Sequence, residues 1–108
     1  VYMSVKSVTK ENFKSIVSEP GVKLIRFWAS WCAPCMMMAP IYKNAANKLS
    51  DKALLGEVDV IAQPDLANLH RIRSIPTTVL YKDGKHMGQF SGVLNESELL
   101  SIVNQALN

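Results

Sequence analysis

The chain has 108 residues, which is enough for one domain with a single hydrophobic core. Hydrophobic residues make up 48% and charged residues 19%, as in ordinary soluble globular proteins, and no stretch approaches the roughly 20 apolar residues of a membrane span. The net charge of +3 comes from scattered basic residues, and the longest basic cluster, residues 70–73, lacks interleaved aromatic side chains. The composition therefore argues against membrane-spanning and nucleic-acid-binding functions.

The first predicted elements lead toward the two cysteines. Residues 4–8 indicate a short strand, and Thr9 is placed to cap the helix that follows. The dipeptide Pro20-Gly21 ends this helix. Residues 22–29 form an apolar run, which is typical of a mostly buried strand.

The only cysteines, Cys32 and Cys35, lie between this strand and a helix-like stretch that continues to about Leu49. Pro34 falls in the first turn of the predicted helix, where its missing N–H group is tolerated. Pro40 falls inside the helix and should bend it. The sequence therefore places both thiols on a turn from the end of a strand into the start of a helix.

The second half of the chain continues the alternation of strands and helices and includes a hairpin. Its predicted elements are a strand, a short helix and two strands, at residues 53–60, 64–71, 77–81 and 85–90. The dipeptide Asp83-Gly84 is a standard hairpin signal between the last two strands. Asn95, with Glu98 three residues later, resembles a capping box at the start of a final helix. This order implies a mixed sheet with helices on both faces.

A helix start suits thiol chemistry. Its backbone N–H groups are unpaired and its dipole favours negative charge, so a thiolate there is stabilised and becomes a nucleophile.

A Cys-x-x-Cys pair has three interpretations, namely half of a zinc site, a redox dithiol or a structural clip. Zinc needs about four ligands, and the other candidates, His70 and His86, show no ligand spacing. A clip would close too short a loop to constrain the unfolded chain much, so the spacing favours a redox dithiol.

The motif Trp31-Cys32-Ala33-Pro34-Cys35, preceded by Phe27-Trp28-Ala29, resembles the active site of the thioredoxin family. Further landmarks of that family follow in the same order. They are a helix-kinking proline, a cis-proline loop, a turn between the last two strands and a glycine facing the active site, at Pro40, Ser74-Ile75-Pro76-Thr77, Lys82-Asp83-Gly84 and Gly92. The resemblance covers nearly the whole chain. It implies the α/β thioredoxin fold, a central mixed sheet of about five strands flanked by about four helices, in a single domain over residues 1–108.

The resemblance also assigns roles to the active-site motif. Cys32 would be the partly exposed nucleophile that attacks a substrate disulfide and forms a mixed disulfide. Cys35 would be the more buried resolving thiol, whose attack releases the reduced substrate and leaves a Cys32–Cys35 disulfide. Ala33 and Pro34 would tune the redox potential, and Ala33 departs from the glycine of most thioredoxins.

Residues around the motif would form a flat apolar surface that binds substrates. Ile75–Pro76 is predicted to be a cis peptide beside the dithiol, with the Ile75 backbone pairing with an extended substrate strand. Trp28 is expected mainly to pack in the core. The expected substrate-binding residues are Trp31, Ile75, Pro76, Gly92 and Val93.

Two charged positions depart from the family pattern. Most thioredoxins have a buried aspartate at the position of Arg26 and a lysine at the position of Glu57, whereas this chain has the opposite charges. Our hypothesis is a swapped pair in which Glu57 takes the proton-transfer role and Arg26 orients it. The alternative is that Arg26 extends to the surface and Glu57 is merely solvated.

The run Met36-Met37-Met38 also differs from the family, which often has a basic residue after the second cysteine. Met36 makes the rim of the site less basic and more apolar. The run suits either an adaptable partner surface or core packing of the helix. We favour core packing for at least one of the three.

The residues and the resemblance together predict a cytoplasmic, monomeric protein-disulfide reductant. It would need no bound cofactor and no metal, because the dithiol carries two electrons supplied from NADPH through a thioredoxin reductase. Its partners would be that reductase and disulfide-containing protein substrates. An exported thiol–disulfide exchange protein is the alternative, because a chain that begins at Val1 leaves open the removal of a leader. A binding subunit that docks partners without turnover is a third possibility.

Overall fold

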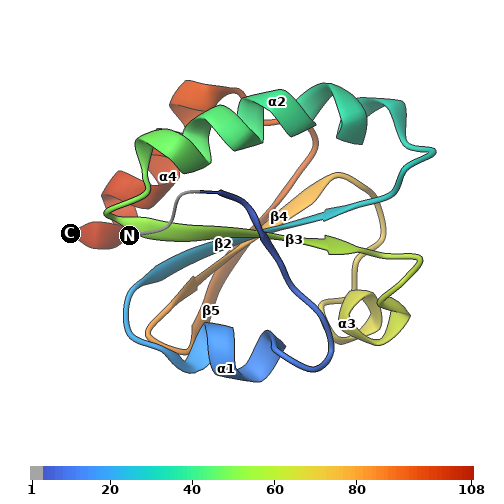
Figure 1. Ribbon diagram of the computed structural model, residues 1–108, viewed down its shortest axis with the longest axis horizontal. Helices are drawn as coiled ribbons and strands as arrows, with labels where there is room; N and C mark the ends of the chain where they lie inside the picture. The colour runs from blue at the N-terminus through green and yellow to red at the C-terminus, as the bar shows by residue number, and fades with distance from the viewer. Residues whose placement is uncertain (1–3) are drawn as a thin grey trace.

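The computed structural model describes residues 4–108, which build a mixed five-stranded sheet in the order β1-β3-β2-β4-β5 (Figure 1). The strands are β1 (Lys6–Ser7), β2 (Val22–Trp28), β3 (Ala53–Asp59), β4 (Thr77–Lys82) and β5 (Lys85–Ser91). Strand β3 pairs in parallel with β1 and β2, whereas β4 pairs antiparallel with β2 and β5. The predicted mixed sheet is confirmed, although β1 is shorter than the predicted strand at residues 4–8.

Four helices cover the two faces of the sheet. They are α1 (Phe13–Ser18), α2 (Ala33–Lys48), α3 (Pro64–Leu69) and α4 (Glu96–Leu107). Helices α2 and α4 lie on one face, and α1 and α3 lie on the other (Figure 1). Within residues 4–108, no helix combines the length and apolar character needed to cross a membrane.

The central strand β2 is buried on both faces, which explains its nearly continuous apolar sequence. Side chains alternate along a strand, so Ile25 and Phe27 pack in the core beneath α1 and α3. Leu24 faces the opposite core, beneath α2 and α4. Arg26 lies two residues after Leu24, so its side chain is on the same face of the sheet and points toward α2.

Helix α2 is held against the sheet by buried side chains. The Tyr42 hydroxyl lies 2.9 Å from the Leu24 carbonyl oxygen and 2.7 Å from that of Gly56, which links the helix to β2 and β3. Met38 is fully buried in the same core, whereas Met36 and Met37 are exposed. Core packing is thus confirmed for one methionine of the run.

The predicted cap at Thr9 is wrong. Residues 9–12 form a turn in which the Thr9 carbonyl accepts hydrogen bonds from the backbone N–H groups of Asn12 and Phe13. The helix therefore begins later, with Asn12 at the N-cap position. The Asn12 side chain instead accepts a hydrogen bond from the Thr9 backbone N–H at 2.7 Å.

Two other local signals are confirmed. The Asn95 side chain accepts a hydrogen bond from the Glu98 N–H, and the Glu98 carboxylate accepts one from the Asn95 N–H, which completes a capping box at the start of α4. In the β4–β5 hairpin, Asp83 and Gly84 have φ angles of 53° and 84°. Two successive positive φ angles characterise the tight turn that Asp-Gly favours.

A buried histidine at the end of α3 links this helix to β4. His70 Nδ1 lies 2.8 Å from the Leu66 carbonyl oxygen, and Nε2 lies 2.7 Å from the Tyr81 hydroxyl. A carbonyl can only accept, so Nδ1 carries the proton and Nε2 accepts from Tyr81. Burial lowers the pKa of His70, nearby His86 lowers it further, and the bond to Leu66 opposes this shift.

We predict that His70 makes folding stability depend on pH. The unfolded state binds a proton at His70 more readily than the folded state does, so stability falls as the pH drops below the ordinary histidine pKa of about 6.5. Urea unfolding at about pH 7 and about pH 5 should show a smaller loss of stability in His70→Gln than in the parent protein. His86→Gln removes the exposed histidine whose charge also lowers the pKa of His70, so it should reduce the loss of stability less than His70→Gln does. An equal loss in the parent and in His70→Gln would contradict this assignment.

Candidate active site

The two cysteines form a disulfide at the start of α2, as the resemblance predicted. Their Cα atoms are 5.2 Å apart. Cys32 is the N-cap residue of the helix, and its Sγ accepts a hydrogen bond from the Cys35 backbone N–H at 3.2 Å. The N-terminal turn of α2 therefore brings both sulfur atoms together and directs an N–H group at Cys32, where a thiolate would be stabilised.

Cys32 and Cys35 differ less in solvent exposure than predicted. Cys35 is fully buried, and Cys32 is only 5% exposed, so the expectation of a partly exposed Cys32 is wrong for this disulfide form. Cys32 packs in a small cluster with Ala29, against the half-buried Trp28 and Ile75. Cys32 is nevertheless the only one of the pair that solvent reaches.

A loop distant in sequence lies against the disulfide. The Ile75–Pro76 peptide bond is cis, as predicted. The Ile75 carbonyl oxygen lies 3.7 Å from Cys32 Sγ. Gly92 donates its N–H to the Pro76 carbonyl at 2.9 Å and has a φ angle of 93°, which glycine adopts without strain. Residues from three parts of the chain therefore meet beside the dithiol.

Exposed apolar side chains surround this junction. Trp31 is 69% exposed and Val93 is 44% exposed, although both are large hydrophobic residues. The neighbouring Ala33, Pro34 and Gly92 are also exposed, whereas Pro76 is buried. The exposed members of this set leave an apolar surface next to Cys32, to which the buried Pro76 side chain does not contribute.

A pocket of about 250 Å³ extends this surface between Trp31 and Ile75. Its remaining lining residues come from the position after β3, from α3 and from the loop after α3: Val60, Ala67, Ile72, Arg73 and Ser74. Of these residues, sequence reasoning identified only Ser74, as part of the predicted cis-proline loop. No local motif marks the others, because the pocket forms only when α3 packs beside the active-site turn.

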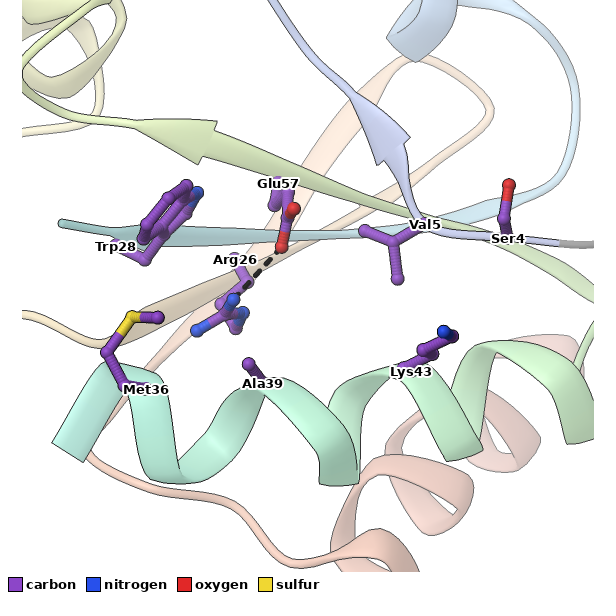
Figure 2. A pocket seen from close by; sticks show the side chains of 8 residues that line it. All are labelled: Ser4, Val5, Arg26, Trp28, Met36, Ala39, Lys43 and Glu57. Carbon is purple, nitrogen blue, oxygen red and sulfur yellow. Dashed lines mark hydrogen bonds and ion pairs between the residues drawn. The ribbon is translucent and has the colours of Figure 1, made fainter. Parts of the chain in front are cut away.

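Arg26 and Glu57 form an ion pair beneath the active site (Figure 2). They occupy directly paired positions on β2 and β3, and Arg26 Nη2 donates to Glu57 Oε2 at 3.0 Å. The Arg26 side chain is 3% exposed and that of Glu57 is 31% exposed. The predicted pairing is confirmed, and the alternative in which Arg26 extends to the surface is wrong.

Arg26 also contacts the active-site helix, which sequence reasoning did not anticipate. Its Nη1 donates to the Cys35 carbonyl oxygen at 2.8 Å. The guanidinium lies 5.8 Å from the ring centroid of Trp28 and 5.4 Å from that of Tyr42. Trp28, expected mainly in the core, is half-buried and therefore also contributes to this environment of Arg26.

A second pocket, of about 360 Å³, opens beside this ion pair. Both Arg26 and Glu57 line it, together with side chains of the N-terminal segment, β2 and α2: Ser4, Val5, Trp28, Met36, Ala39 and Lys43 (Figure 2). The pair is thus close to the surface on one side, although the Arg26 side chain itself is buried.

The structure offers no support for a zinc site. Among residues 4–108, there is no group of three or more His, Cys, Asp or Glu side chains that could hold a metal ion. Cys32 and Cys35 are bonded to each other, and both ring nitrogens of His70 have protein partners.

Comparisons with known proteins agree with this geometry. The Thioredoxin family model matches residues 4–105. The chain is 37% identical over 101 residues to the thioredoxin of Chlamydia caviae, covering 94% of this chain and 97% of that protein. It is 35% identical over 105 residues to the thioredoxin of Staphylococcus epidermidis, covering 97% and 100%.

A solved structure shows the same arrangement of elements. A mutant thioredoxin from Halobacterium salinarum superposes with a TM-score of 0.91 and 26% sequence identity, over 99% of this chain and 94% of that chain. None of these similarities favours the exported exchange protein over a thioredoxin. The chain belongs to the thioredoxin family, and its paired cysteines at the start of α2 make it a thiol–disulfide oxidoreductase.

Proposed function

We propose that this protein is a protein-disulfide reductant in which Cys32 attacks and Cys35 resolves. The observation that carries the proposal is the Cys32–Cys35 disulfide, placed at a helix start with the Ile75 carbonyl 3.7 Å from Cys32 Sγ. Of the two cysteines, Cys32 alone has accessible surface. This difference supports Cys32 as the sulfur that a substrate meets first.

The reaction is two successive thiol–disulfide exchanges. The Cys32 thiolate attacks one substrate sulfur, forming a mixed disulfide as the other substrate sulfur leaves as a thiolate. The Cys35 thiolate then attacks Cys32 Sγ, which forms the intramolecular disulfide and releases the second substrate thiolate. Two electrons pass to the substrate, whose sulfurs take up protons from solvent. Ala33 and Pro34, inside the ring, tune the potential of this couple.

The exposed apolar surface is the substrate-binding site of the proposal. An extended segment that flanks the substrate disulfide would pair with the Ile75 backbone, next to the cis peptide at Pro76. Trp31, Val93 and Gly92 would contact its side chains. The pocket between Trp31 and Ile75 offers room for one apolar substrate side chain.

The remaining parts of the proposal follow from family membership. The chain acts as a single thioredoxin domain over residues 1–108, as a cytoplasmic monomer without bound cofactor, metal, nucleic acid or membrane. Its partners are disulfide-containing proteins and a thioredoxin reductase that returns electrons from NADPH to the Cys32–Cys35 disulfide. The match to full-length thioredoxins supports this assignment.

We further propose that Glu57 accepts the proton of the resolving thiol and that Arg26 orients its carboxylate. Support comes from their ion pair of 3.0 Å and from the partial exposure of Glu57. Glu57 lines the pocket that opens beside Met36, the residue next to Cys35. Solvent entering that pocket can carry the proton between the buried thiol and the carboxylate.

We predict that Cys35→Ser traps substrates. Without the resolving thiol, the first exchange proceeds but the mixed disulfide at Cys32 is not released. Incubation of the reduced variant with a disulfide-bonded protein should give a covalent adduct on a non-reducing gel, and multiple-turnover reduction should be lost.

Cys32→Ser is the matched control and should form no such adduct. A Cys35→Ser protein that keeps full activity would contradict the reductant and would support the binding subunit. An adduct that forms through Cys35 in the Cys32→Ser variant would reverse the two roles.

We predict that Glu57→Gln slows the resolving step. Loss of a general base typically slows a step by about 100-fold. Single-turnover release of a chromogenic thiol from a mixed disulfide at Cys32 should show this loss and a changed pH profile. Glu11→Gln, which removes an exposed carboxylate far from the site in sequence, is the control. If the Glu57 variant keeps the parent rate and pH profile, Glu57 is not the base.

A further inference from the structure

Arg26 connects the sheet to the first turn of the active-site helix. One terminal nitrogen of its guanidinium donates to the Glu57 carboxylate at 3.0 Å, and the other donates to the Cys35 carbonyl oxygen at 2.8 Å. Figure 2 shows the guanidinium between the Glu57 carboxylate and α2. The main chain of the resolving cysteine is therefore tied directly to a buried cation.

This connection restrains the position of Cys35. Helix α2 contains Pro40, which lacks the N–H group that would bond to the Met36 carbonyl, so the turn after the cysteines has one fewer helical hydrogen bond. The Arg26 bond adds a restraint from the sheet to that turn. The two terminal nitrogens of the planar guanidinium serve different acceptors, one the carboxylate and the other the carbonyl.

The ion pair also has an orientation relative to the dithiol. Its positive end contacts the turn that carries Cys35, whereas its negative end lies on the other side of the guanidinium and is partly exposed. Water screens the exposed carboxylate more strongly than the buried cation. Of the two charges, the cation is therefore the one in direct contact with the main chain of Cys35.

We propose that Arg26 is a positioning residue that holds Cys35 for ring closure and raises the reduction potential of the Cys32–Cys35 pair. A positive potential stabilises thiolates, which exist only in the reduced form, and a stabilised reduced form makes the disulfide a stronger oxidant. The rate part of this inference rests on the proposed roles of the two cysteines. The potential part requires only that they interconvert between dithiol and disulfide.

The test compares Arg26→Met with Arg26→Lys. The measured quantity is the equilibrium constant for oxidation of the Cys32–Cys35 dithiol by glutathione disulfide. Arg26→Met should raise this equilibrium constant about tenfold, which lowers the reduction potential of the pair by about 30 mV. Arg26→Lys keeps the charge and should keep an equilibrium constant close to that of the parent. Neither side chain can form both bonds, so both variants should close the ring several-fold more slowly from a mixed disulfide at Cys32.

Two further variants complete the test. Lys43→Met removes an exposed cation that lines the same pocket and should change the equilibrium constant by less than about twofold. Arg26→Met combined with Glu57→Met removes both charges, which buried sites often tolerate. This double variant should raise the equilibrium constant, as Arg26→Met does. It replaces Arg26→Met in the test if that single variant does not fold.

The outcomes separate the two parts of the inference. An unchanged or lowered equilibrium constant in the folded Arg26→Met protein, or in the double variant, overturns the electrostatic role. The same is true if Arg26→Lys shifts the constant as far as Arg26→Met does. Parent-like closure in both single variants overturns the positioning role. Failure of the proposed reductant function would instead appear in the parent protein, as an absence of turnover with disulfide substrates.

Discussion

The junction between β2 and α2 is the constraint on which the rest of the site depends. The chain leaves the buried strand at Trp28 and enters the helix with Cys32 as its N-cap, so the Cys35 N–H group of the first turn donates to the Cys32 sulfur. One helical turn later, the Cα atom of Cys35 lies 5.2 Å from that of Cys32. A disulfide can therefore open and close there without moving the strand that supports it.

Burial on both faces of β2 has a consequence for Arg26, one of its two charged residues. A strand in the middle of the sheet has no solvent-facing side, so Arg26 must find partners inside the protein. It finds them on two elements at once, with Glu57 opposite it on β3 and the Cys35 carbonyl on α2. A buried ion pair adds little to stability on balance, because desolvation offsets the attraction. The role proposed for the pair in this position is electrostatic, since it lies beneath the dithiol.

The rest of the site is assembled from segments that are far apart in the sequence. The cis peptide at Pro76 brings the Ile75 carbonyl to Cys32, and the Gly92 N–H bonds to the Pro76 carbonyl. Trp31 remains exposed beside them. The disulfide, the Ile75 backbone and an apolar rim thus lie together, which is the combination that the proposed exchange with an extended protein substrate requires.

The sequence by itself determined the order of elements, the hairpin, the capping box of α4 and the two cysteines, because these features depend on residues only a few positions apart. It also indicated the loop at Pro76 through the family motif. Local patterns failed at Thr9, where a turn displaced the helix start, and they could not show that Cys32 is nearly buried. Tertiary packing alone decided the pocket beside Trp31 and the contact of Arg26 with Cys35. The reason is physical: these contacts exist only when separate helices and strands pack together, so no short stretch of sequence encodes them.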